Sequence, residues 1–465
     1  MEHFVKINSN GGIITALQLE KITETARASG LSNIGIGSRQ DLWLKCKSGD
    51  QVQKISYLLS ELSIKHELNS DKFPSRSTSF PAEGIFTFDG WITEGNYRSI
   101  LDLFDFQPKL KVNLVDHGQC LNPYFTGHLN FVTSKIPNYW YLYWRMPKEM
   151  DLYLWPKLVY STAIPTLTKK LDDIIKYERI REKKRVVELV ENNLTYLSQE
   201  VQDPLILPRY QFPYYEGFNR IENDYWLGIY RRNDVYDVSF LNEMAKLCQN
   251  TQVPLLCLTT WKSILIKKIG IKDRILWEKL LGKHGINVRH AALELNWMVE
   301  DHLEDAERLK NEIVTALYKE DVRTYGLVFG IKYTESYKSP ASVLIVKNND
   351  NLFDLYHTED FNPNNQNLIE FKKNLKENEL FEAIKELCKY FYKQLNSSEE
   401  FSIKDKTGIE KIEHKKVSKK MYQCLNCLHI YDPELSIDKE KINDYICPVC
   451  ESGKEFFKEV IIEEV

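Results

Sequence analysis

The chain has 465 residues, 43% of them hydrophobic, and its 62 basic and 66 acidic side chains give a formal net charge of -4. This length exceeds what one hydrophobic core supports, so we expect about two to four domains. The balanced charge gives no reason to expect a nucleic-acid partner. The N-terminus shows no apolar segment behind a basic start, and no run reaches the length of a membrane span. We therefore expect a cytoplasmic protein without a membrane partner.

Residues 3–68 predict the order strand, helix, strand, strand, helix, strand, which is that of a ferredoxin-like unit. The first predicted helix carries Leu19, Ile22 and Ala26 on one face, at the spacing of an amphipathic helix. We interpret the Gly11-Gly12 pair as the turn that enters this helix.

The same unit returns later in the chain at a constant offset and without a gap, so that Leu19 corresponds to Leu241 and Ile64 to Ile286. Each unit is followed by a less regular segment with its own strands and a long helix, and we expect the second of these helices to begin near Leu368. A regular repeat is a good guide to architecture. We predict an α+β fold with ferredoxin-like half-domains at 1–70 and 216–292, α/β segments at 71–215 and 293–396, a charged linker at 397–420 and a small metal-binding domain at 421–465.

The last of these segments holds two C-x-x-C pairs, Cys424 with Cys427 and Cys447 with Cys450. Two such turns that face each other enclose a tetrahedral site of four sulfur ligands for iron or zinc. Disulfides are not expected, because the cytosol keeps thiols reduced. The other five cysteines are scattered singly, and Cys248 and Cys257 fall in apolar patterns typical of core residues.

The residues around the pairs read C-x-x-C-x-x-x-Y-D-P and C-P-x-C-x-x-x-K-x-x-F. This combination resembles rubredoxin, a small electron carrier with one iron held by four cysteine thiolates. Leu428 and Glu451 stand where rubredoxins usually carry glycine, and the loop between the pairs is shorter, so a zinc ribbon is the alternative. The resemblance implies an iron site with a small aromatic core of Tyr422, Tyr431, Tyr445 and Phe457.

The stretch GGIITALQLEKITETARASGLSNIGIGSRQDLWL resembles the opening half-domain of the nitrite and sulfite reductase family. Members of that family are tandem repeats of such a half-domain and a larger segment that holds sirohaem and a four-iron cluster. The resemblance implies that Arg39, in the Ser38-Arg39-Gln40 turn, contacts sirohaem carboxylates. The second unit has Thr260-Trp261-Lys262 at that turn.

The family binds its cluster through C-x5-C and C-x3-C after the second half-domain, but residues 287–396 contain one cysteine, Cys388. We therefore expect no four-iron cluster and no six-electron reduction by this chain alone, and we do not expect sirohaem. Arg39, Lys262 and Arg289 are candidate contacts for a tetrapyrrole or an anion, because a carboxylate-rich ring needs several positive charges. The alternative, which we favour, is that they are solvated or structural cations.

These patterns predict an electron carrier or accessory subunit rather than a catalyst, and no residue is assigned a catalytic role. One iron ion held by Cys424, Cys427, Cys447 and Cys450 would exchange single electrons with a redox protein partner, for which a nitrite or sulfite reductase is a candidate. One alternative is a zinc-stabilised interaction protein built on a degenerate reductase scaffold. The other is a divergent sirohaem-binding reductase, which would be an oxidoreductase.

Overall fold

The chain divides by its internal contacts into residues 1–395, the body, and residues 396–465, the C-terminal module. We describe each by itself, from a computed structural model. The described residues are 3–86, 90–118, 121–149, 151–208, 210, 212–221, 223–253, 255–334, 339–397, 418–426, 430–431, 446–447 and 452–463.

The first half-domain is an antiparallel sheet with two helices on one face. Its strands are β1 (His3–Ile7), β3 (Asn33–Ile36), β4 (Leu42–Cys46) and β5 (Glu67–Leu68), and its helices are α1 (Ala16–Ala28) and α2 (Gly49–Glu61). Val5 on β1, Ile34 on β3 and Leu44 on β4 are fully buried, and they share one apolar core with residues of the helices. The Thr15 side chain caps α1 by accepting a hydrogen bond from Gln18 N at 3.1 Å.

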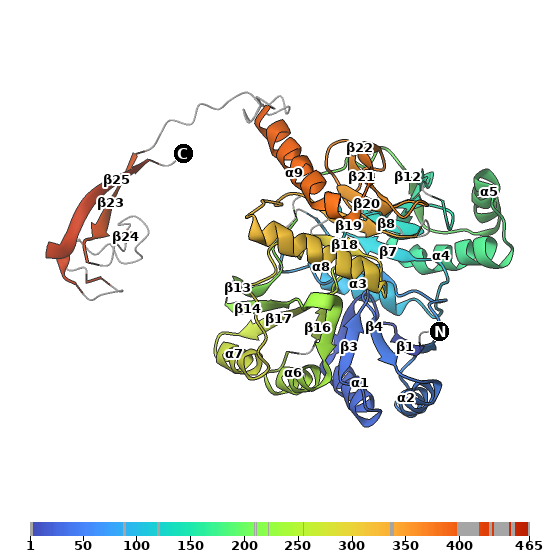
Figure 1. The fold of residues 1–465 in the computed structure, drawn as a ribbon, viewed down its shortest axis with the longest axis horizontal. Helices are drawn as coiled ribbons and strands as arrows, with labels where there is room; N and C mark the ends of the chain where they lie inside the picture. Colours follow the sequence, from blue (N-terminus) through green and yellow to red (C-terminus); the bar gives the residue numbers. More distant parts are fainter. Residues whose placement is uncertain are drawn as a thin grey trace. The chain divides into compact units, whose positions relative to one another are not determined.

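The second half-domain repeats this plan. Its strands are β13 (Gly217–Ile221), β14 (Asp224–Ile229), β16 (Leu255–Leu258) and β17 (Ile264–Gly270), and its helices are α6 (Val238–Asn250) and α7 (Arg274–Lys283). Both ends of α6 follow those of α1 at the constant offset of the sequence repeat. The helices of the two half-domains lie in one row, in which α1 packs against both α2 and α6, and α6 packs against α7 (Figure 1).

The two half-domains exchange a strand. The short strand β2 (Ile13–Thr15), which precedes α1, pairs with β16 of the second half-domain, while β15 (Val235–Asp237), which precedes α6, pairs with β3 of the first. Ile14 lies opposite Leu256, and Tyr236 lies opposite Ile34. Both pairs obey the offset of the repeat, so the exchange is reciprocal. Residues 13–15 were not predicted as a strand.

Each half-domain leads into a second sheet. The first contains β6 (Ser77–Thr78), β7 (Val112–Val115), β8 (Leu129–Thr133), β9 (Tyr139–Trp144), β10 (Tyr153–Leu154), β11 (Lys157–Tyr160) and β12 (Ser198–Glu200). The second contains β18 (Trp297–Val299), β19 (Phe329–Lys332), β20 (Val343–Lys347), β21 (Phe353–Thr358) and β22 (Leu368–Leu375). In both sheets the first three strands run parallel and the next two antiparallel. The repeat therefore extends to these segments.

The segments also carry helices and short turns. The helices are α3 (Glu94–Asp102), α4 (Ile164–Asp172) with a π turn (Asp173–Tyr177), α5 (Lys183–Asn193), α8 (Glu304–Lys319) and α9 (Leu380–Ser397). Short 3-10 turns lie at Ser161–Ala163, Arg232–Asp234, Glu377–Glu379 and Lys454–Phe456. Among the described residues, no helix combines the length and apolarity that a membrane crossing requires.

The prediction of a helix from Leu368 was wrong over its first eight residues. These residues form β22, and the helix, α9, begins at Leu380. β22 is an edge strand that pairs with the buried strand β21, and most of its side chains are exposed. Because an edge strand gains its stability from backbone pairing with a distant segment, its own charged sequence shows no strand pattern.

The described part of the C-terminal module is a three-stranded antiparallel sheet. Its strands are β23 (Ser418–Cys424), β24 (Ile430–Tyr431) and β25 (Phe457–Glu463), with β23 in the middle. Most of the predicted linker, residues 397–420, lies outside the described residues.

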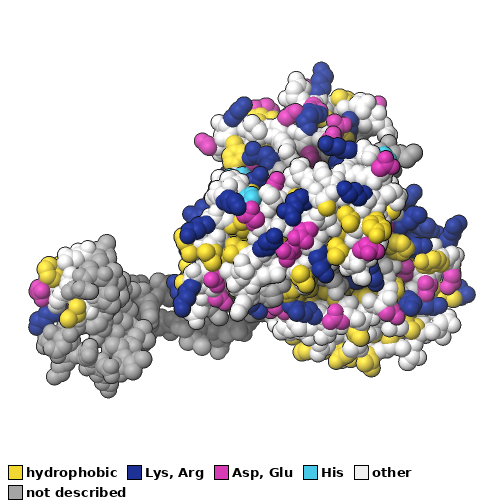
Figure 2. All heavy atoms as spheres, turned by 90° about the horizontal axis from the view of Figure 1, so that it is seen from below, with side chains coloured by type: hydrophobic (Ala, Val, Ile, Leu, Met, Phe, Trp, Pro, Cys, Tyr) yellow, Lys and Arg dark blue, Asp and Glu magenta, His cyan; other side chains and the backbone are white. Residues whose placement is uncertain are grey.

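Basic and acidic side chains are interspersed on the face of the body that Figure 2 shows.

Candidate functional site

The predicted metal site lies in the C-terminal module. Cys424 ends β23 and is fully buried, and Cys447 is fully buried as well. Cys427 and Cys450, the second cysteine of each pair, lie outside the described residues. The structure therefore describes one cysteine from each C-x-x-C pair, and both are shielded from solvent.

Hydrogen bonds connect the loops that carry the two pairs. Asn426, inside the first C-x-x-C, donates from Nδ2 to Ser452 Oγ at 2.8 Å, and Ser452 follows the second C-x-x-C by two residues. Cys447 N donates to Ser452 O at 3.0 Å, which closes the second loop on itself. Leu425 N donates to Phe456 O at 2.7 Å. The two cysteine-bearing loops thus lie side by side, as one shared four-sulfur site requires.

Aromatic residues share a sheet face with Cys424. Tyr422 lies opposite Tyr431 across β23 and β24, and Cys424 lies opposite Phe457 across β23 and β25. Directly opposed residues of antiparallel strands project to the same face, as do residues two apart in one strand. Tyr422 and Phe457, two of the four predicted aromatic residues, therefore share a sheet face with Cys424. The side chain of Tyr431, and Tyr445 as a whole, lie outside the described part of the chain.

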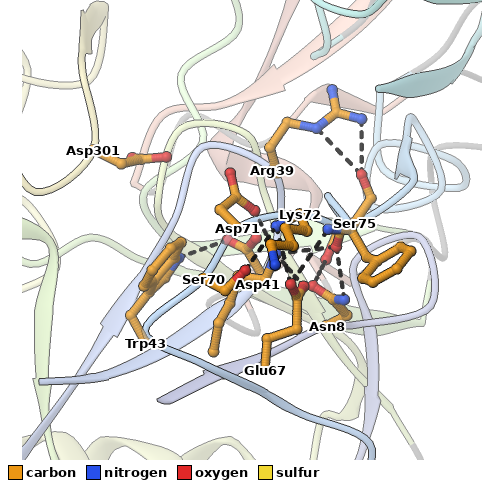
Figure 3. A network of polar contacts seen from close by, with 12 residues as sticks. Asn8, Arg39, Asp41, Trp43, Glu67, Ser70, Asp71, Lys72, Ser75 and Asp301 are labelled. Carbon is orange, nitrogen blue, oxygen red and sulfur yellow. Dashed lines mark hydrogen bonds and ion pairs between the residues drawn. The ribbon is translucent and has the colours of Figure 1, made fainter. Parts of the chain in front are cut away.

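Arg39 is buried, and it anchors the turn after β3 to the following sheet. Its guanidinium donates to Ser75 O at 2.8 and 3.2 Å, to Val112 O at 2.8 Å and to Asn113 Oδ1 at 2.6 Å. Figure 3 shows it turned toward Ser75. Burial lowers the pKa of Arg39 to about 10, which leaves it cationic at neutral pH. The geometry gives this arginine a structural role.

The other two predicted cations lie in different environments. Lys262 is buried and its Nζ lies 2.8 Å from Asp234 Oδ2 and 3.1 Å from Asp301 Oδ1. Arg289 is exposed in the loop after α7, where its backbone N–H bonds to Asn287 Oδ1. Arg289 lines neither the cavity beside Arg39 nor the cavity beside Lys262. The three predicted cations therefore do not form one binding site in the structure.

A small cationic cavity of about 60 Å³ lies beside the Ser38-Arg39 turn. Its basic lining residues are Arg39, Lys111, Arg145 and Lys148, together with His128. Glu149 is the one carboxylate among its described lining residues, and it pairs with Lys183 at 3.0 Å. The volume suits a few water molecules or one small anion. We name this space the cationic cavity.

Lys111 and His128, which both line the cationic cavity, have lowered pKa values. Burial chiefly, and then Arg39, lower the pKa of Lys111, whose Nζ has no hydrogen bond or ion pair in the described part of the chain. His128 Nδ1 accepts a hydrogen bond from Lys111 N at 2.8 Å, so its ring hydrogen is on Nε2. Burial holds the pKa of His128 well below its usual value. The cavity thus offers an ammonium group and a neutral imidazole donor.

Sequence reasoning did not identify this cavity. Its residues come from the first turn, from the loops around β7, β8 and β9, and from Thr260 and Met298 of the second repeat. The only signal was Lys111 itself, a lysine directly before a buried strand in the stretch KLKVNLVD. No local spacing indicates that it meets His128 and Arg145.

Cys388 is the one cysteine of residues 287–396. Cys388 lies on α9 and is buried among the apolar residues of the second α/β segment. Cys248 and Cys257 are buried as predicted. Among the described residues, no three histidine, cysteine or acidic side chains gather into a metal-binding group.

A second cavity, of about 260 Å³, shares Arg145 and Pro340 with the cationic cavity.

The paired half-domains and their following sheets form a fold that is also found in a solved structure. Among solved structures, that of the NirA protein of Mycobacterium tuberculosis is similar, with a TM-score of 0.62 and 14% sequence identity over 86% of this chain and 82% of that one. Because the C-terminal module, residues 396–465, is a small part of the chain, most of this match lies on the body. No model of a protein family matches the sequence, and no curated protein matches it.

Proposed function

We propose that the chain is an electron-transfer protein in which Cys424, Cys427, Cys447 and Cys450 hold one iron ion. The observation that carries the proposal is the Asn426–Ser452 hydrogen bond, which holds the two cysteine-bearing loops together while Cys424 and Cys447 are buried. When bound, iron supplies one-electron chemistry between its ferrous and ferric states. The residues around it set the conditions for that chemistry.

Three features of the module suit such a site. Tyr422 and Phe457 stand beside Cys424 on one sheet face and limit its contact with water. Cys424 belongs to a strand that is paired along its whole length, so its position is fixed by backbone hydrogen bonds. A rigid thiolate set changes little between oxidation states, which favours rapid electron exchange.

The body then serves as a scaffold for a redox partner. Among the described residues of the body, no three histidine, cysteine or acidic side chains gather into a metal-binding group. In this proposal a multi-electron reduction takes place on the partner. A nitrite or sulfite reductase is the partner we propose.

A visible spectrum and metal analysis of the full chain test this function. We expect a red protein with one iron per chain that bleaches with dithionite. Cys447→Ser should remove the colour and leave thermal unfolding of the body unchanged, whereas the matched control Cys46→Ser, in β4, should keep the colour. One zinc and no iron per chain, after expression with both metals supplied, would instead establish the structural zinc alternative.

A second candidate function is the binding of a small anion in the cationic cavity. The ammonium of Lys111, which has no hydrogen bond or ion pair within the described part of the body, favours it, as does the Nε2–H of His128. Calorimetric titration with sulfite and nitrite tests this candidate. Lys111→Met should weaken binding at least about tenfold, which is the loss of one charge-assisted hydrogen bond, and Lys109→Met, a control that does not line the cavity, should not. Equal binding by the two variants would exclude it.

A further inference from the structure

The two half-domains use the same sheet face differently. In the second half-domain, Trp226, Cys257 and Leu265 are buried in the largest apolar cluster of the body, and Phe86 packs edge-on against Trp226 at 5.6 Å. By the offset of the repeat, the equivalent residues of the first half-domain are Phe4, Gly35 and Trp43. Gly35 and Trp43 line a cavity of about 490 Å³. A face that protein fills in one repeat is left open in the other.

Aromatic and apolar side chains form one wall of this cavity, which we name the Trp43 cavity. The Trp43 indole lies 4.0 Å from the His302 ring and 4.8 Å from the Phe4 ring, measured between centroids. Its Nε1 donates to Asp41 Oδ1 at 3.0 Å, which fixes the plane of the ring. Ile36 and Val235 also line the cavity. A volume of this size and an aromatic wall suit a small organic molecule.

The opposite wall is charged, with an excess of carboxylates. Lys262 is paired with Asp234 and with Asp301, and Ser38 donates to Asp301 through its backbone N–H at 3.0 Å and its Oγ at 2.6 Å. Glu307, on α8, also lines the cavity, and its carboxylate has no hydrogen bond or ion pair among the described residues. Burial chiefly, and then Asp234, raise the pKa of Glu307. One ammonium group thus faces three carboxylates.

The rim of the Trp43 cavity carries two lysines and one carboxylate, all exposed to solvent. Lys45 Nζ lies 2.7 Å from Glu304 Oε1, and both side chains are largely exposed. Lys47 is exposed at the same rim. Because exposed charges are screened by solvent and buried charges are not, the interior carboxylates dominate the potential inside. The cavity therefore attracts cations.

One of these carboxylates, that of Asp234, stands at a position whose backbone conformation favours glycine. Asn233 and Asp234 have positive φ values of 64° and 58°, and the equivalent residues of the first repeat, Gly11 and Gly12, have 68° and 84°. Glycine is the residue that adopts this conformation without strain. The second repeat instead carries Asp234, whose side chain reaches Lys262 in the cavity wall.

We propose that the Trp43 cavity binds an organic cation, an amine with an aromatic ring. Its ammonium group would pair with Glu307, and its ring would lie against Trp43 and His302. This site is separate from the cysteines of the C-terminal module, so it stands or falls independently of the iron.

Calorimetric titration of the full chain with 2-phenylethylamine, 2-phenylethanol and phenylacetate tests the proposal. These probes share a ring and differ in charge. We expect saturable binding of the amine with one site per chain, at least tenfold weaker binding of the alcohol and no binding of the carboxylate.

Variants locate the site. Glu307→Gln should weaken amine binding at least tenfold, whereas Glu312→Gln, on the same helix but outside the Trp43 cavity, should leave it unchanged. Trp43→Leu should weaken binding of the amine and the alcohol alike, and thermal unfolding shows whether each variant is folded. Absence of saturable amine binding, or undiminished binding by a folded Glu307→Gln variant, would overturn the proposal.

Discussion

Ser38 Oγ donates a hydrogen bond to Asp301 Oδ2 across 2.6 Å, although 263 positions separate the two residues in the sequence. Lys262, at the turn equivalent to that of Ser38 in the second repeat, lies 3.1 Å from the other carboxylate oxygen. Asp301 therefore joins the signature turns of both half-domains to the start of the second α/β segment. The stability of the body should depend on this carboxylate.

Asp301→Asn should destabilise the body by roughly 2–3 kcal/mol at pH 7, because the buried ammonium of Lys262 would lose one of its two carboxylate partners. Burial opposes ionisation of Asp301, but Lys262, His302 and Ser38 together outweigh it and hold its pKa below the usual value. A lowered pKa stabilises the folded state above about pH 4, and this contribution is lost as the pH falls. Urea unfolding should show the difference at pH 7 and a smaller one at pH 3. If Asp301→Asn lowered the unfolding free energy equally at pH 7 and pH 3, the stabilising role of the ionised carboxylate would be refuted.

Asp41→Asn should have the opposite pH dependence. Burial chiefly, and then Asp301, raise the pKa of Asp41 to about 7. A raised carboxyl pKa means that the folded state holds a proton that the unfolded state releases, so stability falls as the pH rises from about 4 to 7. Asparagine keeps an acceptor for Trp43 Nε1 and removes the titration. Relative to the parent, the variant should gain up to about 4 kcal/mol between pH 4 and pH 8 in urea unfolding. If the difference in unfolding free energy between variant and parent were the same at pH 4 and pH 8, the pKa of Asp41 would not be raised.

Arg39→Lys should destabilise the body by about 2–4 kcal/mol, because lysine cannot reproduce the planar set of donors to Ser75 O, Val112 O and Asn113. Arg289→Lys, at an exposed position, should change the stability by less than about 0.5 kcal/mol. Thermal or urea unfolding checks both. If Arg39→Lys were as stable as the parent, Arg39 would be free for the ligand-binding role that the family resemblance implies.

Asn426→Ala should accelerate loss of iron from the module to a chelator by up to about tenfold, the effect of one hydrogen bond of about 0.5–1.5 kcal/mol. Ser452→Ala should do the same. The double variant should lose no more than either single variant, because both remove one shared interaction. Additive effects would show that the two side chains act separately. This prediction rests on the proposed iron site.

The sequence predicted those parts of the fold that local spacing encodes. Leu19, Ile22 and Ala26 are separated from their counterparts in the second half-domain by the same number of residues. The repeat could therefore be recognised from the sequence alone. The α/β segments kept the strand order but not the offset. The separation between the starts of β7 and β19 differs from that between β8 and β20, and neither equals the separation of the half-domains. Ungapped comparison therefore could not reveal their kinship.

Long-range pairing accounts for what sequence reasoning missed. The strands β2 and β15 are short, and each has its partner in the other half-domain, so no periodicity marks them. The cationic cavity likewise takes its residues from separate loops. Resemblance indicated that Arg39 matters, but only the structure shows its donors bound to backbone oxygens.

The half-domains exchange strands as the subunits of a domain-swapped homodimer do: β2 pairs with β16, and β15 pairs with β3. Here both halves of the exchange belong to one polypeptide. A fragment ending before Gly217 would lack β15 beside β3 and would have no sheet for β2. A second copy of the fragment, related by a two-fold axis, would satisfy both. Because both halves belong to one polypeptide, equivalent positions can carry different residues, as Gly12 of the first half-domain and Asp234 of the second do.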